Sequence, residues 1–162
     1  MPTQEESASA ALKGLAYLSA MIFYYFAREA TETLGEKEGH ALIARAIRQM
    51  GEARGRRIRA AVDAAGEEPT LDNMFKHYDL PIGQAWQSHK DKLEGPVAYR
   101  ATYTYCPLAE LWQSLSAEEL GLFYCDIDVA IVAGYNPNIE IRRLKSLLQR
   151  EGCCLYEYSY RT

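Results

Sequence analysis

The chain has 162 residues, 48% of them hydrophobic, so it is long enough to bury a sizeable core and most simply forms one domain over residues 1–162. Its 22 acidic residues outnumber its 18 basic ones and give a formal net charge of −4, which argues against broad binding of a phosphate backbone. We therefore expect no nucleic-acid partner.

The N-terminal segment lacks the marks of a targeting sequence, because Glu5 and Glu6 stand where a secretory signal carries basic residues. The apolar run 15–27 is too short to span a bilayer and ends at Arg28 and Glu29, so it predicts a buried helix or a contact with another subunit. We expect a cytoplasmic homo-oligomer without a membrane partner, in which the four cysteines are reduced thiols.

Apolar residues recur at helical spacing through the first half of the chain. The spacing predicts long helices over 5–33 and 36–65, with Gly35 closing the first of them. Gly51 and Gly55 lie inside the second helix, where glycine lowers helix propensity, and this spacing is typical of close packing against another helix.

The second helix also carries a basic cluster, made up of Arg54, Arg56, Arg57 and Arg59. Acidic residues accompany it at positions 52 and 63, so we interpret the cluster as a solvated helix face rather than an anion site. Downstream, Thr70 is expected to cap a short helix, and a further helix is expected over 81–93.

The second half changes to a period of two, which predicts strands over 97–105, 139–148 and 154–160. A helical pattern covers 107–133, with a break near Ser116 as a second N-cap. The last two strands should form an antiparallel hairpin that the first strand joins. The fold class is α+β: a helical N-terminal half packed on a small antiparallel sheet, with further helices between the strands.

Cys106 stands where a predicted strand gives way to a helix. Pro107 follows it and suits the first helical position, so Cys106 is the expected N-cap. Free backbone N–H groups and the positive end of the helix dipole favour a thiolate there, and we expect the pKa of Cys106 to be depressed.

Cys125 and Asp128 are three residues apart in the next predicted helix and should share one face. The residues around Asp128 are apolar, so its carboxylate must be either paired or functional. Core packing is the ordinary role of Cys125 and Cys154, and of Trp112 and Tyr124, when each is considered alone.

Several short motifs, taken together and in order, resemble the L-2-amino-thiazoline-4-carboxylic acid hydrolase family over roughly residues 35–160. They are Cys106-Pro107-Leu108-Ala109-Glu110-x-Trp112, Tyr124-Cys125-x-x-Asp128, Gly134-Tyr135-Asn136-Pro137 and Gly152-x-Cys154, with Gly51-x-x-x-Gly55-Arg56 upstream. The resemblance implies a hydrolase that opens a small 2-aminothiazoline ring to an N-carbamoyl cysteine. We expect no cofactor. His40 and His77 match none of these motifs, so the general base stays open.

On this reading four residues form one catalytic pocket: Cys106, Cys125, Asp128 and Asn136. Cys106 would attack as a thiolate or polarise the site, Asp128 would act as a base or hold the substrate amino group, and Asn136 would bind a carboxylate or a developing charge. Asn136 reaches the pocket only if the chain reverses at 134–137. The expected substrate-binding residues are Tyr105, Trp112, Tyr124 and Cys154.

Two alternatives remain. Zinc could be held by Cys106, Cys125, Asp128 and Cys154 with a histidine, although no closely spaced ligand pair supports a metal. A non-catalytic module that binds or senses a small molecule would use the aromatic residues Tyr103, Tyr105, Trp112 and Tyr156. Such a module needs no depressed thiol pKa, so thiol alkylation against pH separates it from the enzyme.

Overall fold

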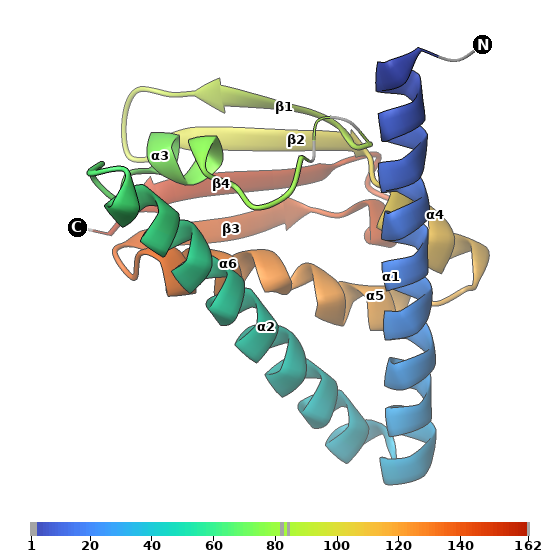
Figure 1. The fold of residues 1–162 in the computed structure, drawn as a ribbon. Coiled ribbons are helices and arrows are strands. Elements are labelled where there is room, and N and C mark those ends of the chain that lie inside the picture. The colour runs from blue at the N-terminus through green and yellow to red at the C-terminus, as the bar shows by residue number, and fades with distance from the viewer. Residues whose placement is uncertain (1–2, 82, 84, 162) are drawn as a thin grey trace.

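The structure, a computed structural model, describes residues 3–81, 83 and 85–161. Its elements in chain order are α1 (Gln4–Leu34), α2 (Glu36–Ala64), α3 (Leu71–Lys76), β1 (Gln87–Lys92), β2 (Tyr99–Tyr105), α4 (Pro107–Ser114), α5 (Glu118–Cys125), α6 (Ile127–Tyr135), β3 (Ile139–Lys145), the 3-10 turn η2 (Leu147–Gln149) and β4 (Cys154–Tyr160). The predicted α+β fold, with helices between the strands of an antiparallel sheet, is confirmed (Figure 1).

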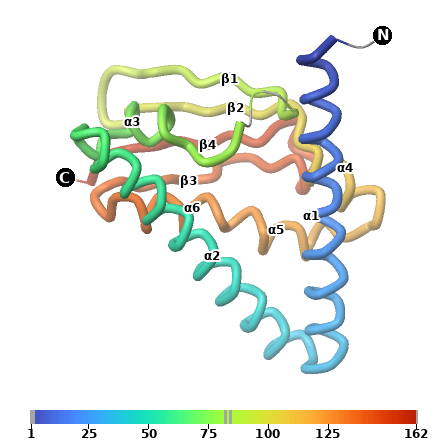
Figure 2. The backbone as a smooth tube through the Cα atoms, in the orientation of Figure 1, coloured from blue at the N-terminus to red at the C-terminus, as the bar shows by residue number. Residues whose placement is uncertain are grey.

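The sheet has four strands in the order β1-β2-β4-β3, and each neighbouring pair is antiparallel. The predicted hairpin of β3 and β4 is present, and β2 joins it by pairing with β4, with Tyr99 opposite Tyr158. Three helices, α4 to α6, occupy the connection between β2 and β3. In this connection α5 and α6 run along one side of the sheet, next to β3 (Figure 2).

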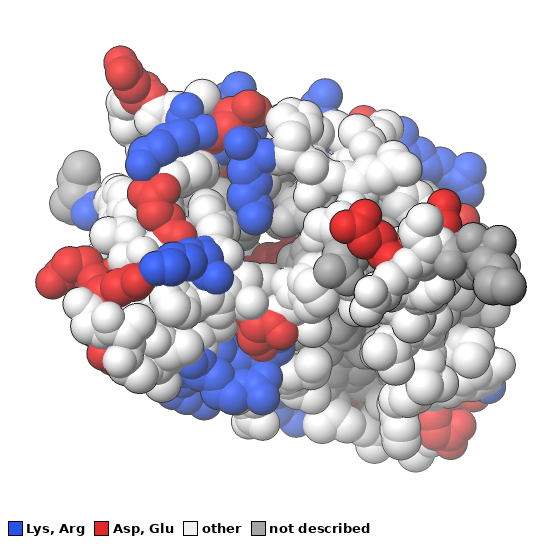
Figure 3. Space-filling view, turned by 45° about the horizontal axis from the view of Figure 1, so that its top comes forward, with Lys and Arg blue, Asp and Glu red and all other residues white. Residues whose placement is uncertain are grey.

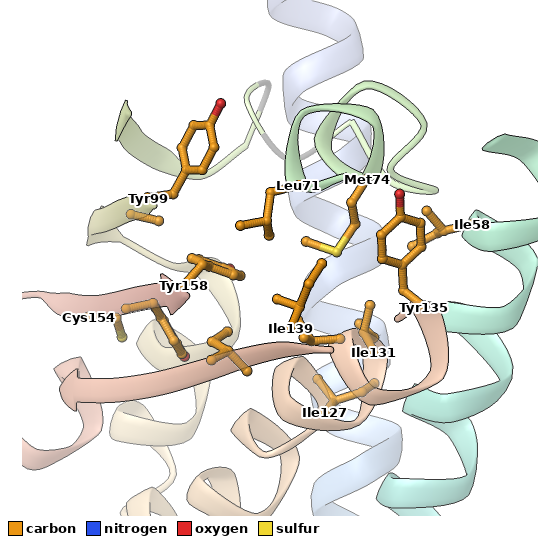
Figure 4. Packing of buried hydrophobic residues seen from close by; sticks show 14 of the residues in the cluster. Ile58, Leu71, Met74, Tyr99, Ile127, Ile131, Tyr135, Ile139, Cys154 and Tyr158 are labelled. Carbon is orange, nitrogen blue, oxygen red and sulfur yellow. The ribbon is translucent and has the colours of Figure 1, made fainter. Parts of the chain in front are cut away.

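One face of the sheet is buried and the other is polar, as the period of two requires. The buried face carries Tyr99, Ala101, Ile139, Ile141, Cys154, Tyr156 and Tyr158. Side chains from α2, α3 and α6, such as Ile58, Met74 and Ile131, complete this core (Figure 4). The core therefore lies between the sheet and the helices, and it includes Cys154 and Tyr156 of the buried face.

The two glycines of α2 allow it to touch α6, as predicted. A Cβ on Gly51 would lie 2.5 Å from the Cβ of Ala130, and one on Gly55 would lie 2.1 Å from the carbonyl oxygen of Ile131. No side chain fits at such distances, so the helix backbones are in direct contact. This contact fixes the position of α6, the helix that bears Asp128 in its first turn.

Helix α1 begins with a capping box between Thr3 and Glu6. It packs on α4 through Ala20 and on α2 through Ala27, both of which are buried. Among the described residues it is the one helix long and apolar enough, by length and composition, to cross a membrane. The helix is longer than the apolar run 15–27 because Ala10, Ala11 and Leu12 extend that run on its N-terminal side, whereas Arg28 and Glu29 end it on the other. The expectation that the protein has no membrane partner stays a prediction.

The helix expected over 81–93 is absent where the chain is described, and residues 82 and 84 lie outside the described residues. Residues Gln87–Lys92 form β1 instead, an edge strand that is exposed along its whole length. Backbone hydrogen bonds to β2 hold this segment as a strand. Its exposed polar residues show no alternation of apolar and polar positions, so the sequence pattern does not predict a strand here.

The long helix expected over 107–133 is three helices. The first break falls at Ser116, as predicted, but Ser116 has a φ of 52° and Ala117 is the N-cap. The second falls at Asp126 between α5 and α6, so Cys125 and Asp128 lie on different helices. The strand expected over 139–148 ends at Lys145, and its last residues form η2.

Candidate functional site

A cavity of about 100 Å³ lies between the buried face of the sheet and the helices that follow β2. The aromatic side chains in its wall are Tyr78, Trp86, Tyr103, Trp112, Tyr124 and Tyr156. Its ionisable side chains other than tyrosine are Arg54, Cys106, Cys125, Asp128 and Cys154. Apolar walls with a few converging polar groups are typical of a small-molecule site. Figure 3 shows a hollow near the middle of one face, with charged side chains of both signs around it.

Cys106 is the N-cap of α4, with Pro107 at the first helical position, as predicted. The indole Nε1 of Trp86 donates a hydrogen bond to its Sγ at 3.2 Å. Burial nevertheless raises the pKa of the Cys106 thiol to about 11, although the backbone N–H groups of Leu108 and Ala109 and the Trp86 indole oppose the shift. The predicted depression of this pKa was wrong, because loss of hydration outweighs the helix N-terminus.

Cys125 ends α5, and its thiol lines the cavity beside Asp128. Burial raises the pKa of Cys125 well above its ordinary value, and the negative charge of Asp128 raises it further. Cys125 is therefore a neutral thiol next to a carboxyl group. The sequence correctly placed the two residues together, although α5 and α6 are separate helices.

Asp128 lies in the first turn of α6 and faces the cavity. Burial raises the pKa of its carboxyl group, while a hydrogen bond from Tyr156 and the positive charges of Arg54 and Arg143 act against the shift. In turn burial and the Asp128 charge raise the pKa of Tyr156. The pKa of the Asp128 carboxyl group therefore reflects burial, which the Tyr156 hydroxyl and the two arginines offset only in part.

Cys154, Trp112 and Tyr124 also line the cavity, where the sequence placed them. The backbone N–H of Leu147 donates to the Cys154 Sγ at 3.3 Å, and burial raises the pKa of this thiol. The Trp112 indole donates to the carbonyl oxygen of Ala20 at 3.1 Å, and its ring lies 5.3 Å from that of Tyr124. These contacts hold the two rings in fixed positions.

Tyr105 and Asn136 do not line the cavity. The Tyr105 hydroxyl donates to Glu110 at 2.6 Å, at the end of β2 and outside the site. The Asn136 amide donates to the carbonyl oxygen of Pro69 at 2.9 Å and accepts from the backbone N–H of Asn138. The chain turns after α6 to begin β3 rather than returning to Asp128, so Asn136 is a turn residue.

Arg54 is the residue that sequence reasoning misread, because it is only 8% exposed and lines the cavity. Its Nε and Nη2 bind the two oxygens of Asp79 at 3.0 and 2.5 Å. Arg56 and Arg57 are solvated, as predicted for the whole cluster. A signal was present, because Arg54 stands on the same helical stripe as Gly51 and Ile58, both of which are buried.

No group of three or more His, Cys, Asp or Glu residues that could hold a metal ion is found in the described part of the chain. The proposed zinc ligands Cys106, Cys125, Asp128 and Cys154 share one cavity wall without forming such a cluster.

Comparison with models of protein families matches residues 16–158 to the L-2-amino-thiazoline-4-carboxylic acid hydrolase family. The chain belongs to this family. The resemblance predicted from the motifs is therefore confirmed, and the family match begins nearer the N-terminus, inside α1. A search of curated proteins finds no match.

Among solved structures, this member of the hydrolase family is similar to a trafficking protein particle complex subunit 3 from Naegleria fowleri, covalently bound to palmitic acid. The similarity has a TM-score of 0.57 at 16% sequence identity and covers 93% of this chain and 97% of that one. At this identity the comparison shows a shared fold and nothing of activity.

Proposed function

We propose that the protein is a hydrolase of a small ring compound with adjoining C–N and C–S bonds, and that L-2-amino-thiazoline-4-carboxylate is its first candidate substrate. The observation that carries the proposal is the convergence of Asp128, Cys125 and Cys106 on one aromatic cavity. Membership of the family supports the substrate class.

Two charges of opposite sign suit the two ends of this substrate. Its ring bears a basic amidine-like group, which the carboxylate of Asp128 would hold. Its carboxylate would bind Arg54, the one Lys or Arg among the described residues of the cavity wall. The hydrogen bonds of Arg54 to Asp79 use Nε and Nη2, and Nη1 would donate to the substrate carboxylate.

The same carboxyl group can move the protons that the reaction requires. Asp128 takes a proton from a water molecule as the water oxygen attacks the carbon between nitrogen and sulfur, and passes this proton to the ring nitrogen. The C–S bond then breaks as the hydroxyl oxygen forms the carbonyl, and Asp128 transfers the hydroxyl proton to the sulfur. The product is N-carbamoyl cysteine with a free thiol. A raised carboxyl pKa makes Asp128 a stronger base than an ordinary aspartate.

The thiols serve this scheme as neutral groups. The pKa of about 11 disfavours attack by a Cys106 thiolate, so Cys106 and Cys125 would polarise the site or donate a proton.

The test is release of free thiol from L-2-amino-thiazoline-4-carboxylate by purified protein. We expect Asp128→Asn to lower the rate at least about 100-fold, the usual scale for loss of a general base, and Cys125→Ser to lower it less. The matched control is Cys153→Ser, which changes a half-buried cysteine outside the cavity and should keep full activity. Absence of thiol release by the wild type, or an unchanged rate in Asp128→Asn, would refute the proposal.

The second candidate is a non-catalytic module that binds a small molecule. The raised pKa of every cysteine in the cavity wall favours it, because a binding site needs no reactive thiol. The similar solved structure, which carries covalently bound palmitic acid, gives an example of this fold holding an apolar ligand. Binding of the thiazoline by calorimetry without thiol release would favour this candidate over the hydrolase.

A further inference from the structure

The two long helices leave an apolar surface uncovered. We define the α1–α2 face by six large side chains that are 40% to 75% exposed: Leu18, Ile22, Tyr25, Phe26, Leu34 and Leu42. With about 180 Å² for a fully exposed large apolar residue, these side chains offer roughly 600 Å². That area reaches the upper end of what a monomer normally leaves exposed and approaches the ~800 Å² that each partner buries in a stable complex.

The α1–α2 face carries both an exposed side chain and a groove. Phe26 has 75% of its surface exposed. It lies on the rim of an open groove of about 540 Å³ between α1 and α2, where Ala30, Ile43 and Ile47 form part of an almost entirely apolar lining. A knob and a hole on one surface allow two copies to exchange the same contact about a twofold axis.

Charge argues for a second copy rather than a lipid surface. Helix α1 carries four acidic residues against two basic ones, a net charge of −2: Glu5, Glu6, Glu29 and Glu32 against Lys13 and Arg28. Helices that lie on membranes are rich in lysine and arginine, which α1 lacks. One edge of the α1–α2 face presents Arg28 and Glu29, one of each sign, which a second copy can pair with its own Glu29 and Arg28 about a twofold axis.

We propose that a second copy of this chain covers the α1–α2 face, in a twofold pair in which Phe26 of each copy enters the α1–α2 groove of the other. The pair leaves the catalytic cavity outside the interface, because no residue of the α1–α2 face lines that cavity.

Sedimentation equilibrium of the full chain at micromolar concentration tests the pair. We expect about twice the 18.3 kDa of one chain for the wild type, and one chain's mass for Phe26→Glu. Leu42→Glu changes the α2 wall of the groove and should also give the mass of one chain. This second variant separates loss of the pair from any effect of Phe26→Glu on the folding of α1. The matched control is Leu144→Glu, which alters a similarly exposed leucine on β3 and should keep the doubled mass.

Circular dichroism of each variant confirms that the helices persist. A monomeric wild type would overturn the proposal, as would a doubled mass that survives both Phe26→Glu and Leu42→Glu. A monomer that co-sediments with vesicles of phosphatidylcholine, alone or mixed with phosphatidylserine, would assign the face to lipid and equally overturn it.

Discussion

Asp128 is buried, and burial makes the negative charge of its carboxylate unfavourable for the stability of the fold. Packing alone would favour an apolar residue at the start of α6, as at its neighbour Ile127. A buried ionisable group that lowers the stability of the fold and faces a cavity is typical of a catalytic acid or base. The sequence already indicated this, because Asp128 stands among apolar residues with no partner nearby in the chain.

We expect Asp128→Asn to raise the free energy of unfolding at pH 7 by on the order of 1 kcal/mol while it lowers activity. The pKa of the folded carboxyl is above its ordinary value of 3.8, so the folded state binds that proton more tightly than the unfolded state. Wild-type stability therefore falls as pH rises from that ordinary value through the raised one. Urea unfolding should show a gap between variant and wild type at pH 7 that narrows towards pH 4.

The control for this experiment is Asp126→Asn, which alters an exposed carboxylate that pairs with Arg143 at 3.1 Å and should bring no gain in stability. A loss of stability in Asp128→Asn at both pH values would contradict the assignment of Asp128 as a strained group.

Cys106 shows the limit of reasoning from neighbours in the chain. Its position at the strand-to-helix turn followed from Pro107, but its pKa depends on burial among residues distant in sequence, which outweighs the hydrogen bond from Trp86. We expect alkylation of Cys106 by iodoacetamide to stay slow at pH 8 and to accelerate until the pH approaches about 11. Mass spectrometry of tryptic peptides would follow the modification. A fast phase for Cys106 near pH 7 would instead restore the thiolate nucleophile.

At the scale of elements, the contact between α2 and α6 decides where the site stands. We expect Gly55→Ala to destabilise the protein by about 3 kcal/mol, because the new methyl group would meet the backbone of α6. The matched control is Gly14→Ala in α1, where nothing lies within 4 Å of the added atom and a gain of up to about 1 kcal/mol is expected. Denaturant titrations measure both, and equal effects would show that the helices do not touch at Gly55.

Periodicity predicted the elements that bury a regular apolar face and failed for those that do not. The helices over 5–33 and 36–65 and the three paired strands were found because their inward residues repeat. Strand β1 was missed because it is exposed on both faces and is held by backbone pairing. The break at Asp126 was missed because the apolar pattern runs through it, and only packing against α2 shows where α6 begins.

At the scale of the molecule, most of the predicted site lines one cavity, and what was missed came from outside the motifs. Tyr78 and Trp86 belong to the segment before β1, which carries no regular pattern. Arg54 was hidden in a charged cluster. Asn136 was misplaced because its position depended on how the chain leaves α6, which no local pattern specifies.

The cavity wall is assembled from residues as far apart in the chain as Arg54 and Tyr156, and no two neighbouring elements enclose it alone. The cavity therefore exists only when the sheet and the helices that line it are in place, and it is lost when the chain unfolds. Anything that occupies it binds the folded state alone, so its binding free energy adds to that of the whole fold. A ligand bound in the cavity would raise the melting temperature of the entire chain, whether or not it reacts.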